Sequence, residues 1–430
     1  MTAVIPSSAL ARQAAGGISG RMLANAALAM AVFLGGFVLF EPAPYELFFI
    51  PVIFFWTIAG LRFPRSIMPL MLLLLVFAAG GLIASTQVTG WEKAPLYMAV
   101  SIFLALTSMF LAAVIADEPD RLGLIMKVYV ASAAFAAFLG ILGYFSAFPG
   151  AYELFTKFHR ARGPFQDPNV FGPFLVLPTV WLARTILTRP IFGSLGHLAL
   201  LALLVLGIFL SFSRAAWGLT AVGLMLLWFL LFFNEPAATK RLRLLALAGS
   251  GIVVVALLIM GALLIPQVSE LFAERAKLVQ DYDGERLGRF ARHIIGFKLA
   301  MDNPLGIGAL EFSKRLPEDP HNTFLKSLVA YGWLGFVAYV SLVVWTFARA
   351  FPILFKRRPW VPYLQCAYVV FTGHVFISMV IDIDHWRHYY LILGVIWGII
   401  ALDVRASRPK TALPARAEHA KDLALRSGNG

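Results

Sequence analysis

Long runs of apolar residues recur along almost the whole chain, and they constrain its fold more than any other feature. A run of roughly 20 apolar residues allows a helix to cross the hydrocarbon core of a bilayer. Inside that core the backbone must satisfy its own hydrogen bonds, so such runs fold as helices. With 60% hydrophobic and only 14% charged residues, the composition lies outside the range of water-soluble domains. The chain is therefore expected to be an integral membrane protein.

The apolar runs predict an all-α, polytopic membrane protein with about 12 transmembrane helices. We predict one transmembrane domain over residues 1–430, a long loop at 266–322 between the ninth and tenth spans, and a cytoplasmic tail at 405–430. The predicted spans are 22–40, 44–60, 66–86, 95–116, 121–147, 170–188, 193–211, 214–233, 244–265, 323–348, 360–381 and 388–404.

The distribution of Lys and Arg predicts the orientation, because cytoplasmic connections are enriched in both. The basic connections are Arg62/Arg65, Arg184/Arg189, Lys240/Arg241/Arg243, Lys356/Arg357/Arg358 and the tail after residue 404. The N-terminus lacks the order of charged start, apolar core and cleavage site that marks a signal peptide, and we expect it to be a short cytoplasmic tail. With both termini inside, the outer face carries 148–169, 211–214, 266–322 and 382–387.

Charge, cysteine content and missing motifs exclude several functions. The net charge of +13 is explained by membrane orientation and attraction to anionic lipids rather than by nucleic-acid binding. Cys366 is the single cysteine and lies in an apolar span, so neither a disulfide framework nor redox chemistry is expected. The sequence has no phosphate-binding P-loop, dinucleotide-binding or HExxH zinc motif. We expect no cofactor, and any activated donor must already lie in the membrane.

The long loop is expected to contain helical pieces at Val268–Gln280 and Leu287–Met301. Arg286, Arg289 and Arg292 recur every three residues, which brings their side chains to one side of a helix. The segment 303–308, Asn-Pro-Leu-Gly-Ile-Gly, ends that helix. A new helix is expected after His321, with Asn322 or Thr323 at its N-cap.

Arginines on the outer face are exceptions to the charge distribution, and they suggest a bound anion. The set comprises Arg160, Arg162, Arg214, Arg289, Arg292 and Arg387. A guanidinium is always charged and presents a planar fork that suits two phosphate oxygens. The alternative for each arginine is an interfacial position or a pair with a carboxylate.

Histidine and aspartate accompany these arginines. His321 is a candidate general base, because a neutral imidazole accepts a proton near neutral pH, and Asp319 is in position to orient it. The alternative is a histidine that only caps or holds the loop. Asp382, Asp384, His385 and His388 have the side chains of a divalent-metal site. We expect no metal there, since Asp384 can instead pair with an arginine such as Arg387.

Three segments carry a family resemblance: SFSRAAWGL, GRFARHIIGFKLAMDNPLGIGALEF and HNTFLKSLVAYGWLGF. They resemble the O-antigen ligase and polymerase superfamily of bacterial envelope glycan assembly, over roughly residues 150–400. The resemblance implies glycan transfer from undecaprenyl pyrophosphate to an acceptor hydroxyl, at the periplasmic face of the bacterial inner membrane. The acceptor is the lipid A core for a ligase and a growing glycan for a polymerase. Neither a metal nor a nucleotide is implied.

The resemblance assigns roles to matching residues. Arg214, Arg289 and His321 are the implied catalytic residues, with the arginines on the pyrophosphate and the histidine at the reaction centre. The further substrate-binding candidates are Arg160, Arg162, Arg286, Arg292, Asn322, Asp384 and Arg387. This chain has His293 where an aromatic residue, often Trp, is common in the family.

Two functions of other classes remain as alternatives. A transporter or lipid flippase would place ionisable residues at mid-membrane and broken helices at matched positions. A scaffold subunit would not need arginines and a histidine gathered at one face. The charges of this chain cluster at the ends of its apolar runs, which favours glycan transfer.

Overall fold

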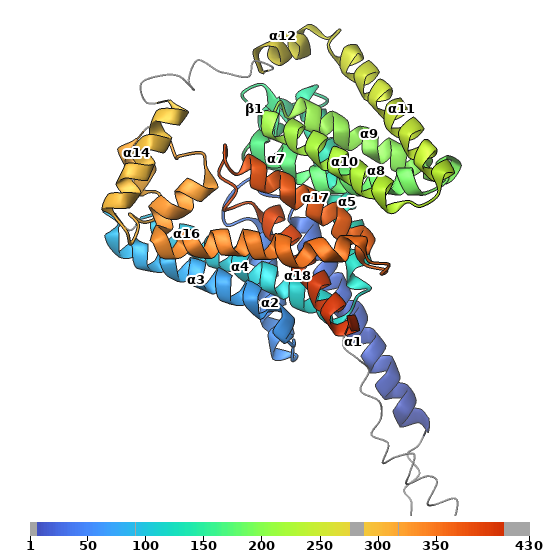
Figure 1. Cartoon of the computed structure of the whole chain (residues 1–430), viewed down its shortest axis with the longest axis horizontal. Coiled ribbons are helices and arrows are strands. Elements are labelled where there is room, and N and C mark those ends of the chain that lie inside the picture. The colour runs from blue at the N-terminus through green and yellow to red at the C-terminus, as the bar shows by residue number, and fades with distance from the viewer. Residues whose placement is uncertain (1–6, 91, 276–287, 317, 408–430) are drawn as a thin grey trace, which may run out of the picture.

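A computed structural model describes residues 7–90, 92–275, 288–316 and 318–407 (Figure 1). Within these residues, eight helices are long and apolar enough to cross a membrane. Shorter apolar helices lie at Gly20–Leu34, Pro44–Ile58, Leu195–Leu210 and Val361–Ile377. Together they account for the predicted spans, and the predicted all-α polytopic fold class is confirmed.

In chain order the elements are α1 (Ser7–Leu34), α2 (Pro44–Ile58), η1 (Arg65–Ile67), α3 (Met68–Ala84), η2 (Ser85–Gln87), α4 (Ala94–Asp117), α5 (Arg121–Tyr144), α6 (Ala151–Phe155), β1 (Thr156–Lys157), β2 (Arg160–Ala161), α7 (Pro168–Phe174), α8 (Val176–Thr188), η3 (Ile191–Ser194), α9 (Leu195–Leu210), α10 (Arg214–Asn234), α11 (Ala238–Ala262), α12 (Pro266–Arg275), α14 (Arg289–Asp302), α15 (Glu311–Arg315), α16 (Thr323–Ala350), η4 (Phe351–Phe355), α17 (Val361–Ile377) and α18 (Arg387–Ser407). The two short strands pair antiparallel.

The centre of the bundle is the contact between α4 and α18, both of which are largely buried. Small residues permit this close approach, as is common between membrane helices. A Cβ added to Gly394 would lie 2.8 Å from the Ser108 carbonyl oxygen, and one added to Gly398 would lie 2.8 Å from Ile115 Cβ. Helix α3 packs on α16 beside this pair (Figure 1), whereas α11 lies at the periphery and is almost entirely exposed.

Loops that are distant in sequence meet at one end of the bundle, which we call the long-loop end. There Val38 bridges to Phe165, Arg160 donates to the Ser211 carbonyl, and Thr323 donates to the Ser378 carbonyl. In Figure 1 this end includes α14, at the left of the view.

The basic connections meet at the opposite end of the bundle. Lys356 pairs with Asp403, and Arg405 donates to the Ala116 carbonyl. Arg243 donates to the Arg189 carbonyl. The two groups of connections that the Lys and Arg distribution separates are thus found at opposite ends.

The helix predicted at 323–348 is interrupted, which the sequence analysis missed. Gly332 has φ 67° and ψ −173° inside α16, a conformation that favours glycine. The segment 303–308 docks into this break, where Trp333 N–H donates to the Pro304 carbonyl at 3.0 Å and Ile307 N–H to the Val329 carbonyl at 2.8 Å. The segment 303–308 was expected only to end a helix, but it also forms hydrogen bonds with the backbone of α16 at its break.

Other boundaries differ from the predictions for local reasons. Helix α1 ends at Leu34 rather than near 40, and Lys240 lies on α11 rather than in a connection. The span predicted at 170–188 consists of α7 and α8, which meet at Leu175. In the long loop, α12 and α14 match the described parts of the predicted helical pieces, whose residues 276–280 and 287 lie outside the described residues. Helix α15 and the β1–β2 pair elsewhere were not predicted.

Candidate functional site

The start of α16 is fastened to the loop between α17 and α18, residues 378–386. Thr323 N–H donates to the Ser378 carbonyl at 2.7 Å, and its hydroxyl donates to the Ile381 carbonyl at 3.1 Å. The same hydroxyl accepts from Ile383 N–H at 2.9 Å. Asn322 is the N-cap, since its side chain accepts from Leu325 N–H at 3.1 Å. These bonds hold the α17–α18 loop next to the residues that precede α16.

Lys326 lies one turn into α16 and is the centre of a buried charge cluster. Its Nζ lies 3.2 Å from Asp384 Oδ1, 3.6 Å from Asp319 Oδ2 and 3.9 Å from Asp382 Oδ2. It also lies 5.3 Å from the centroid of the Tyr97 ring, at a distance that permits a cation–π contact. Sequence reasoning missed this lysine, although a cation in the second turn of an otherwise apolar helix is a detectable signal.

Asp384 is the best satisfied carboxylate of the cluster. Its Oδ2 accepts from the Tyr97 hydroxyl at 2.6 Å, and its backbone carbonyl accepts from the Tyr390 hydroxyl at 3.0 Å. Burial disfavours its charge, but attraction to Lys326 and His385 and the side-chain hydrogen bonds from Tyr97 and Lys326 outweigh burial and lower the pKa of Asp384. Asp384 was predicted to pair with an arginine; the cation that the structure provides is Lys326.

Asp382 is the least satisfied carboxylate. Its Oδ1 is buried and has no hydrogen-bond partner among the described residues. Burial, followed by the charges of Asp384 and Asp319, raises the pKa of Asp382 to about 6, against the opposing effects of Lys326 and His321. A buried acceptor without a partner costs roughly 1–3 kcal/mol, so this oxygen is a candidate for a role in function.

His321 lies between two carboxylates at the surface of the cluster. Its Nε2 lies 3.3 Å from Glu318 Oε2, and its Nδ1 lies 3.9 Å from Asp382 Oδ2. The backbone has φ 52°, which non-glycine residues rarely adopt. Asp319, which the sequence analysis proposed as the orienting residue, lies instead beside Lys326.

Helix α14 contributes Arg292 to this site. The Arg292 side chain is buried, and its Nη1 donates to Glu318 Oε2 at 2.8 Å and approaches the Asp319 carbonyl at 3.4 Å. The hydrogen bond from Arg292 is the main cause of the lowered pKa of Glu318. His293 Nε2 lies 2.9 Å from the Pro320 carbonyl oxygen. Both contacts fix α14 against the segment that carries His321.

Two of the predicted arginines lie partly or wholly outside the described residues. Arg289 is the first residue of α14, but its side chain lies outside the described residues. Arg286 lies outside them altogether. Their predicted roles remain predictions.

A second group of arginines lies around the corner between α9 and α10. Arg160 is buried, and it donates to the Ser211 carbonyl at 2.8 Å and to Asn169 Oδ1 at 2.8 Å. Arg162 donates to the Leu154 carbonyl at 3.1 Å, and its buried Nε has no hydrogen-bond partner among the described residues. Arg214 begins α10, whose N-cap is Ser213.

The packing of α10 on α17 relates this corner to the charge cluster. A Cβ on Gly373 of α17 would lie 2.3 Å from Leu219 Cδ1 of α10. Arg214 is five residues before Leu219, and Ser378 is five residues after Gly373. Because α10 leaves the long-loop end and α17 approaches it, Arg214 and the α17–α18 loop lie at the same level of the bundle.

Arg387 is held apart from this site. Its Nε donates to Glu46 Oε1 at 2.6 Å, and its Nη2 donates to Glu41 Oε1 at 3.3 Å. The arginine and Glu46 are both buried. This predicted substrate-binding arginine therefore connects α18 to α2 through Glu46 and to the α1–α2 connection through Glu41.

No group of three or more His, Cys, Asp or Glu side chains in the described part of the chain is arranged to hold a metal ion. His385, a metal candidate by sequence, lies 2.7 Å from Ser101 Oγ and stacks on Tyr97 with ring centroids 3.8 Å apart. Burial lowers the pKa of His385 to about 4. At the centre of the carboxylates lies the ammonium of Lys326.

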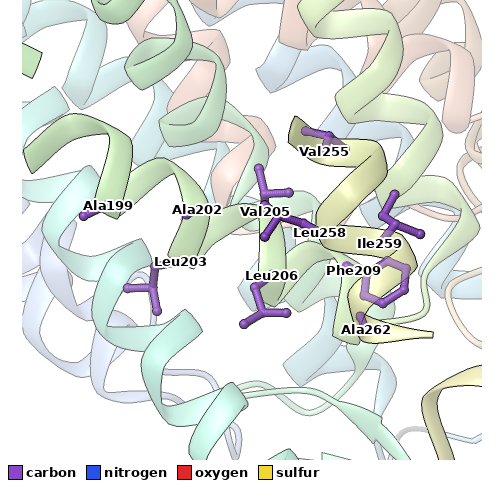
Figure 2. A pocket seen from close by; sticks show the side chains of 10 residues that line it. All are labelled: Ala199, Ala202, Leu203, Val205, Leu206, Phe209, Val255, Leu258, Ile259 and Ala262. Atoms are coloured by element: carbon purple, nitrogen blue, oxygen red, sulfur yellow. The ribbon is translucent and has the colours of Figure 1, made fainter. Parts of the chain in front are cut away.

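An apolar groove of about 340 Å³ lies between α9 and α11 (Figure 2). Phe209 lies at its end nearest the α9–α10 corner, with its ring centroid 5.9 Å from that of Trp217 and 6.0 Å from that of Phe272. The groove is lined by Ala199, Ala202, Leu203, Val205, Leu206, Phe209, Val255, Leu258, Ile259 and Ala262. Its lining suits a hydrocarbon chain rather than a polar ligand.

Fold and site together define a polytopic helical membrane protein with a charged site at one end of an apolar bundle. Residues 199–340 match the family model described as O-antigen ligase, which supports the predicted resemblance to the O-antigen ligase superfamily. The matched segment contains Arg214, Arg289, Arg292, His321 and Lys326, and it ends before Asp382 and Asp384. A comparison with curated proteins finds no match to this chain.

Proposed function

We propose that this protein transfers a glycan from undecaprenyl pyrophosphate to an acceptor hydroxyl at the periplasmic face of the bacterial inner membrane. The proposed reaction is the ligation of O-antigen to the lipid A core. The family match supports a function of the O-antigen ligase or polymerase type. The observation that carries the proposal is the gathering of Arg292, His321 and a buried carboxylate cluster at one end of the bundle.

The proposed chemistry is one displacement at the anomeric carbon of the donor sugar. The acceptor oxygen forms the new bond, the bond to the pyrophosphate oxygen breaks, and the hydroxyl proton passes to His321. Fixed arginines favour this reaction because they neutralise the charge that develops on the leaving pyrophosphate. Arg292 and His321 already share the Glu318 carboxylate, which supports the binding of an anionic group between them.

Lipid attachment of the donor is supported by the α9–α11 groove. It lies between the apolar helices α9 and α11, and the residues that line it are all apolar (Figure 2). Helix α9 leads from the groove to Ser211, whose carbonyl binds Arg160, and then to Arg214. A polyprenyl chain in this groove would therefore bring its pyrophosphate to the arginines of the α9–α10 corner.

The experiment is complementation of a strain that lacks this chain. Arg214→Ala, Arg289→Ala and Arg292→Ala should each abolish transfer at matched expression, because each removes charged hydrogen bonds worth about 1.5–3 kcal/mol. Arg289→Lys should also fail, since an ammonium lacks the two-pronged geometry. Arg315→Ala is the control, because Arg315 is an exposed arginine of the same loop.

The lipopolysaccharide pattern of the deletion strain identifies the acceptor reaction. Bare lipid A core together with accumulated lipid-linked polymer supports a ligase, whereas core with one repeat unit supports the alternative, a polymerase that uses the same donor. Activity should survive EDTA if arginines neutralise the charge. Normal transfer by all three alanine variants would reject the proposed arginine site.

A further inference from the structure

The proposed reaction gives no role to the buried carboxylate of Asp382. It lies in the α17–α18 loop with one oxygen 3.9 Å from His321 Nδ1 and also 3.9 Å from Lys326 Nζ. Its other oxygen is buried and has no hydrogen-bond partner among the described residues. A buried carboxylate with an unused oxygen next to an imidazole is arranged to accept one more hydrogen bond.

We infer that Asp382 is the positioning residue of His321, and that the two form a carboxylate–imidazole pair when the acceptor binds. The inference rests on the proposed function, because it assigns a partner to the proposed base. Asp382 would accept a hydrogen bond from Nδ1–H, which fixes the tautomer and leaves the lone pair of Nε2 free to take the acceptor proton.

The geometry selects Asp382 among the neighbouring carboxylates. Asp384 is already bound by Lys326 and the Tyr97 hydroxyl, and Asp319 lies 3.6 Å from Lys326 Nζ. Glu318 is close to Nε2, the nitrogen that must face the acceptor. Only Asp382 of these described residues is within 4 Å of Nδ1 in an ion-pair contact.

The remaining gap between His321 Nδ1 and Asp382 is small, and His321 is the more exposed partner. A hydrogen bond needs a distance of about 2.7–3.2 Å, so His321 must approach Asp382 by roughly 1 Å. The α17–α18 loop is fastened to Thr323 by three hydrogen bonds, whereas the His321 side chain is 32% exposed. Catalytic hydrogen bonds are often long without substrate and shorten in the complex.

The charges around Asp382 determine the pH range in which its carboxylate is ionised and can stabilise the His321 imidazolium. Lys326 faces it from α16, Asp384 belongs to its own loop, and Asp319 and His321 face it from the segment before α16. Burial and the two aspartates raise the pKa of Asp382 to about 6, although Lys326 and His321 oppose this. Asp382 is thus ionised at neutral pH and takes up a proton as the pH falls below about 6, which removes the charge that would stabilise the imidazolium.

The proposed step accounts for both the acceptor proton and the electron pair of the broken bond. The acceptor O–H proton moves to His321 Nε2 while the acceptor oxygen forms its bond to the anomeric carbon. The electron pair of the broken bond leaves with the pyrophosphate. The imidazolium, stabilised by Asp382, then returns its proton to solvent or to the released pyrophosphate.

The test uses the purified full-length chain in lipid nanodiscs with lipid-linked donor and acceptor. Asp382→Asn should lower kcat by about 10²-fold, within the range of acid–base effects, leave the donor KM unchanged, and shift the loss of rate on acidification to lower pH. Asp382→Glu should recover part of the rate. In a His321→Gln background, Asp382→Asn should cause no further loss, because residues that act as a unit are not additive.

A second readout does not depend on activity. Diethyl pyrocarbonate modifies neutral imidazole, so the pH dependence of labelling of the His321 peptide reports its protonation. Asp382→Asn should shift this curve to lower pH, since an imidazolium without its carboxylate is less stable. An unchanged curve together with wild-type kcat in Asp382→Asn would overturn the inference. If Asp382→Asn shifts the curve but the wild-type chain transfers no glycan, the proposed function is overturned and the Asp382–His321 pair stands.

Discussion

Each end of the helix bundle has a buried aspartate that pairs with a lysine from a distant part of the chain. At the long-loop end, Lys326 Nζ lies 3.2 Å from Asp384; at the opposite end, Lys356 Nζ lies 2.6 Å from Asp403. The surroundings differ more than the distances do. The side chain of Lys326 is 10% exposed and has two further carboxylates nearby, whereas that of Lys356 is 40% exposed.

The comparison shows that a short distance is a poor measure of an ion pair's importance. The attraction between two charges grows as water is removed, and so does the cost of leaving one charge alone. At the opposite end, Arg121 binds Asp117 and Glu118, which are close in sequence, and Arg21, whose side chain is 59% exposed, pairs with the same Glu118. We expect substitutions there to affect stability modestly, and substitutions at the long-loop end to affect both stability and turnover.

The sharpest test of this difference is a histidine substitution at each end. His321→Ala should reduce turnover by about 10²–10⁴-fold while leaving donor binding intact, because it removes the proposed base. His321→Gln should be nearly as inactive, since an amide cannot take the proton. The control is His197→Gln on α9, at the opposite end. Radiolabelled glycan transfer and donor pull-down measure both effects, and a fully active glutamine variant at position 321 would return His321 to a structural role.

The second test compares the two lysines directly. Lys326→Met should destabilise the protein by about 3–5 kcal/mol, because it leaves a buried carboxylate cluster without its cation. Lys356→Met should cost less, about 1 kcal/mol, since the Lys356 side chain is 40% exposed and water screens its pair with Asp403. Thermal unfolding in detergent gives both values. Equal losses would mean that burial does not separate the two pairs.

The third test uses pH. The folded-state pKa of Asp382 is raised to about 6 from 3.8, so this residue stabilises the fold fully below pH 3.8, and the contribution is lost as the pH rises through about 6. The change should be at most about 3 kcal/mol. Asp382→Asn should remove this component of the unfolding profile between pH 4 and 8. A pH dependence that persists unchanged in the variant would show that other groups cause it.

The smallest expected effect concerns the apolar groove, away from both charge clusters. Val255→Trp fills the space between α9 and α11 and should raise the KM for the lipid-linked donor a few-fold, with little change in kcat. Val254→Trp is the matched control, because Val254 is 53% exposed on the same helix and does not line the groove. Steady-state kinetics with donor in mixed micelles separates the two variants. Equal KM values would argue against lipid binding in this groove.

Much of the fold was predictable because membrane insertion is decided by local sequence windows. The apolar runs predicted the membrane helices, and the loops expected on one face do meet at one end of the bundle. The break at Gly332 was not predicted, because hydropathy does not register a backbone conformation that another segment stabilises. The boundary of α1 was missed for a related reason, since the apolar residues Phe37 and Val38 continue beyond the helix.

The sequence predicted the residue types of the candidate site better than it predicted which of these residues pair with one another. The N-cap was expected at Asn322 or Thr323, and the structure has it at Asn322; capping was predictable because it depends on a few neighbouring residues. Asp319 was proposed as the partner of His321 from its proximity in sequence, yet Asp382 is the carboxylate near Nδ1. Arg387 was proposed for substrate, and two glutamates bind it instead. Lys326 was missed although a lysine in an apolar helix is detectable, and its pairing could not be predicted because its partner Asp384 lies 58 residues away.

By itself, the sequence determined that this chain crosses a membrane many times and that arginines and a histidine gather near the ends of its helices. Both properties follow from the solvation free energy of short segments, which is additive along the chain. Only the tertiary structure decided which charges meet. Lys326 and Asp384 lie 58 residues apart, and they pair because α16 is bonded to the α17–α18 loop at Thr323. A contact of that kind depends on how helices pack, and no window of sequence contains both of its partners.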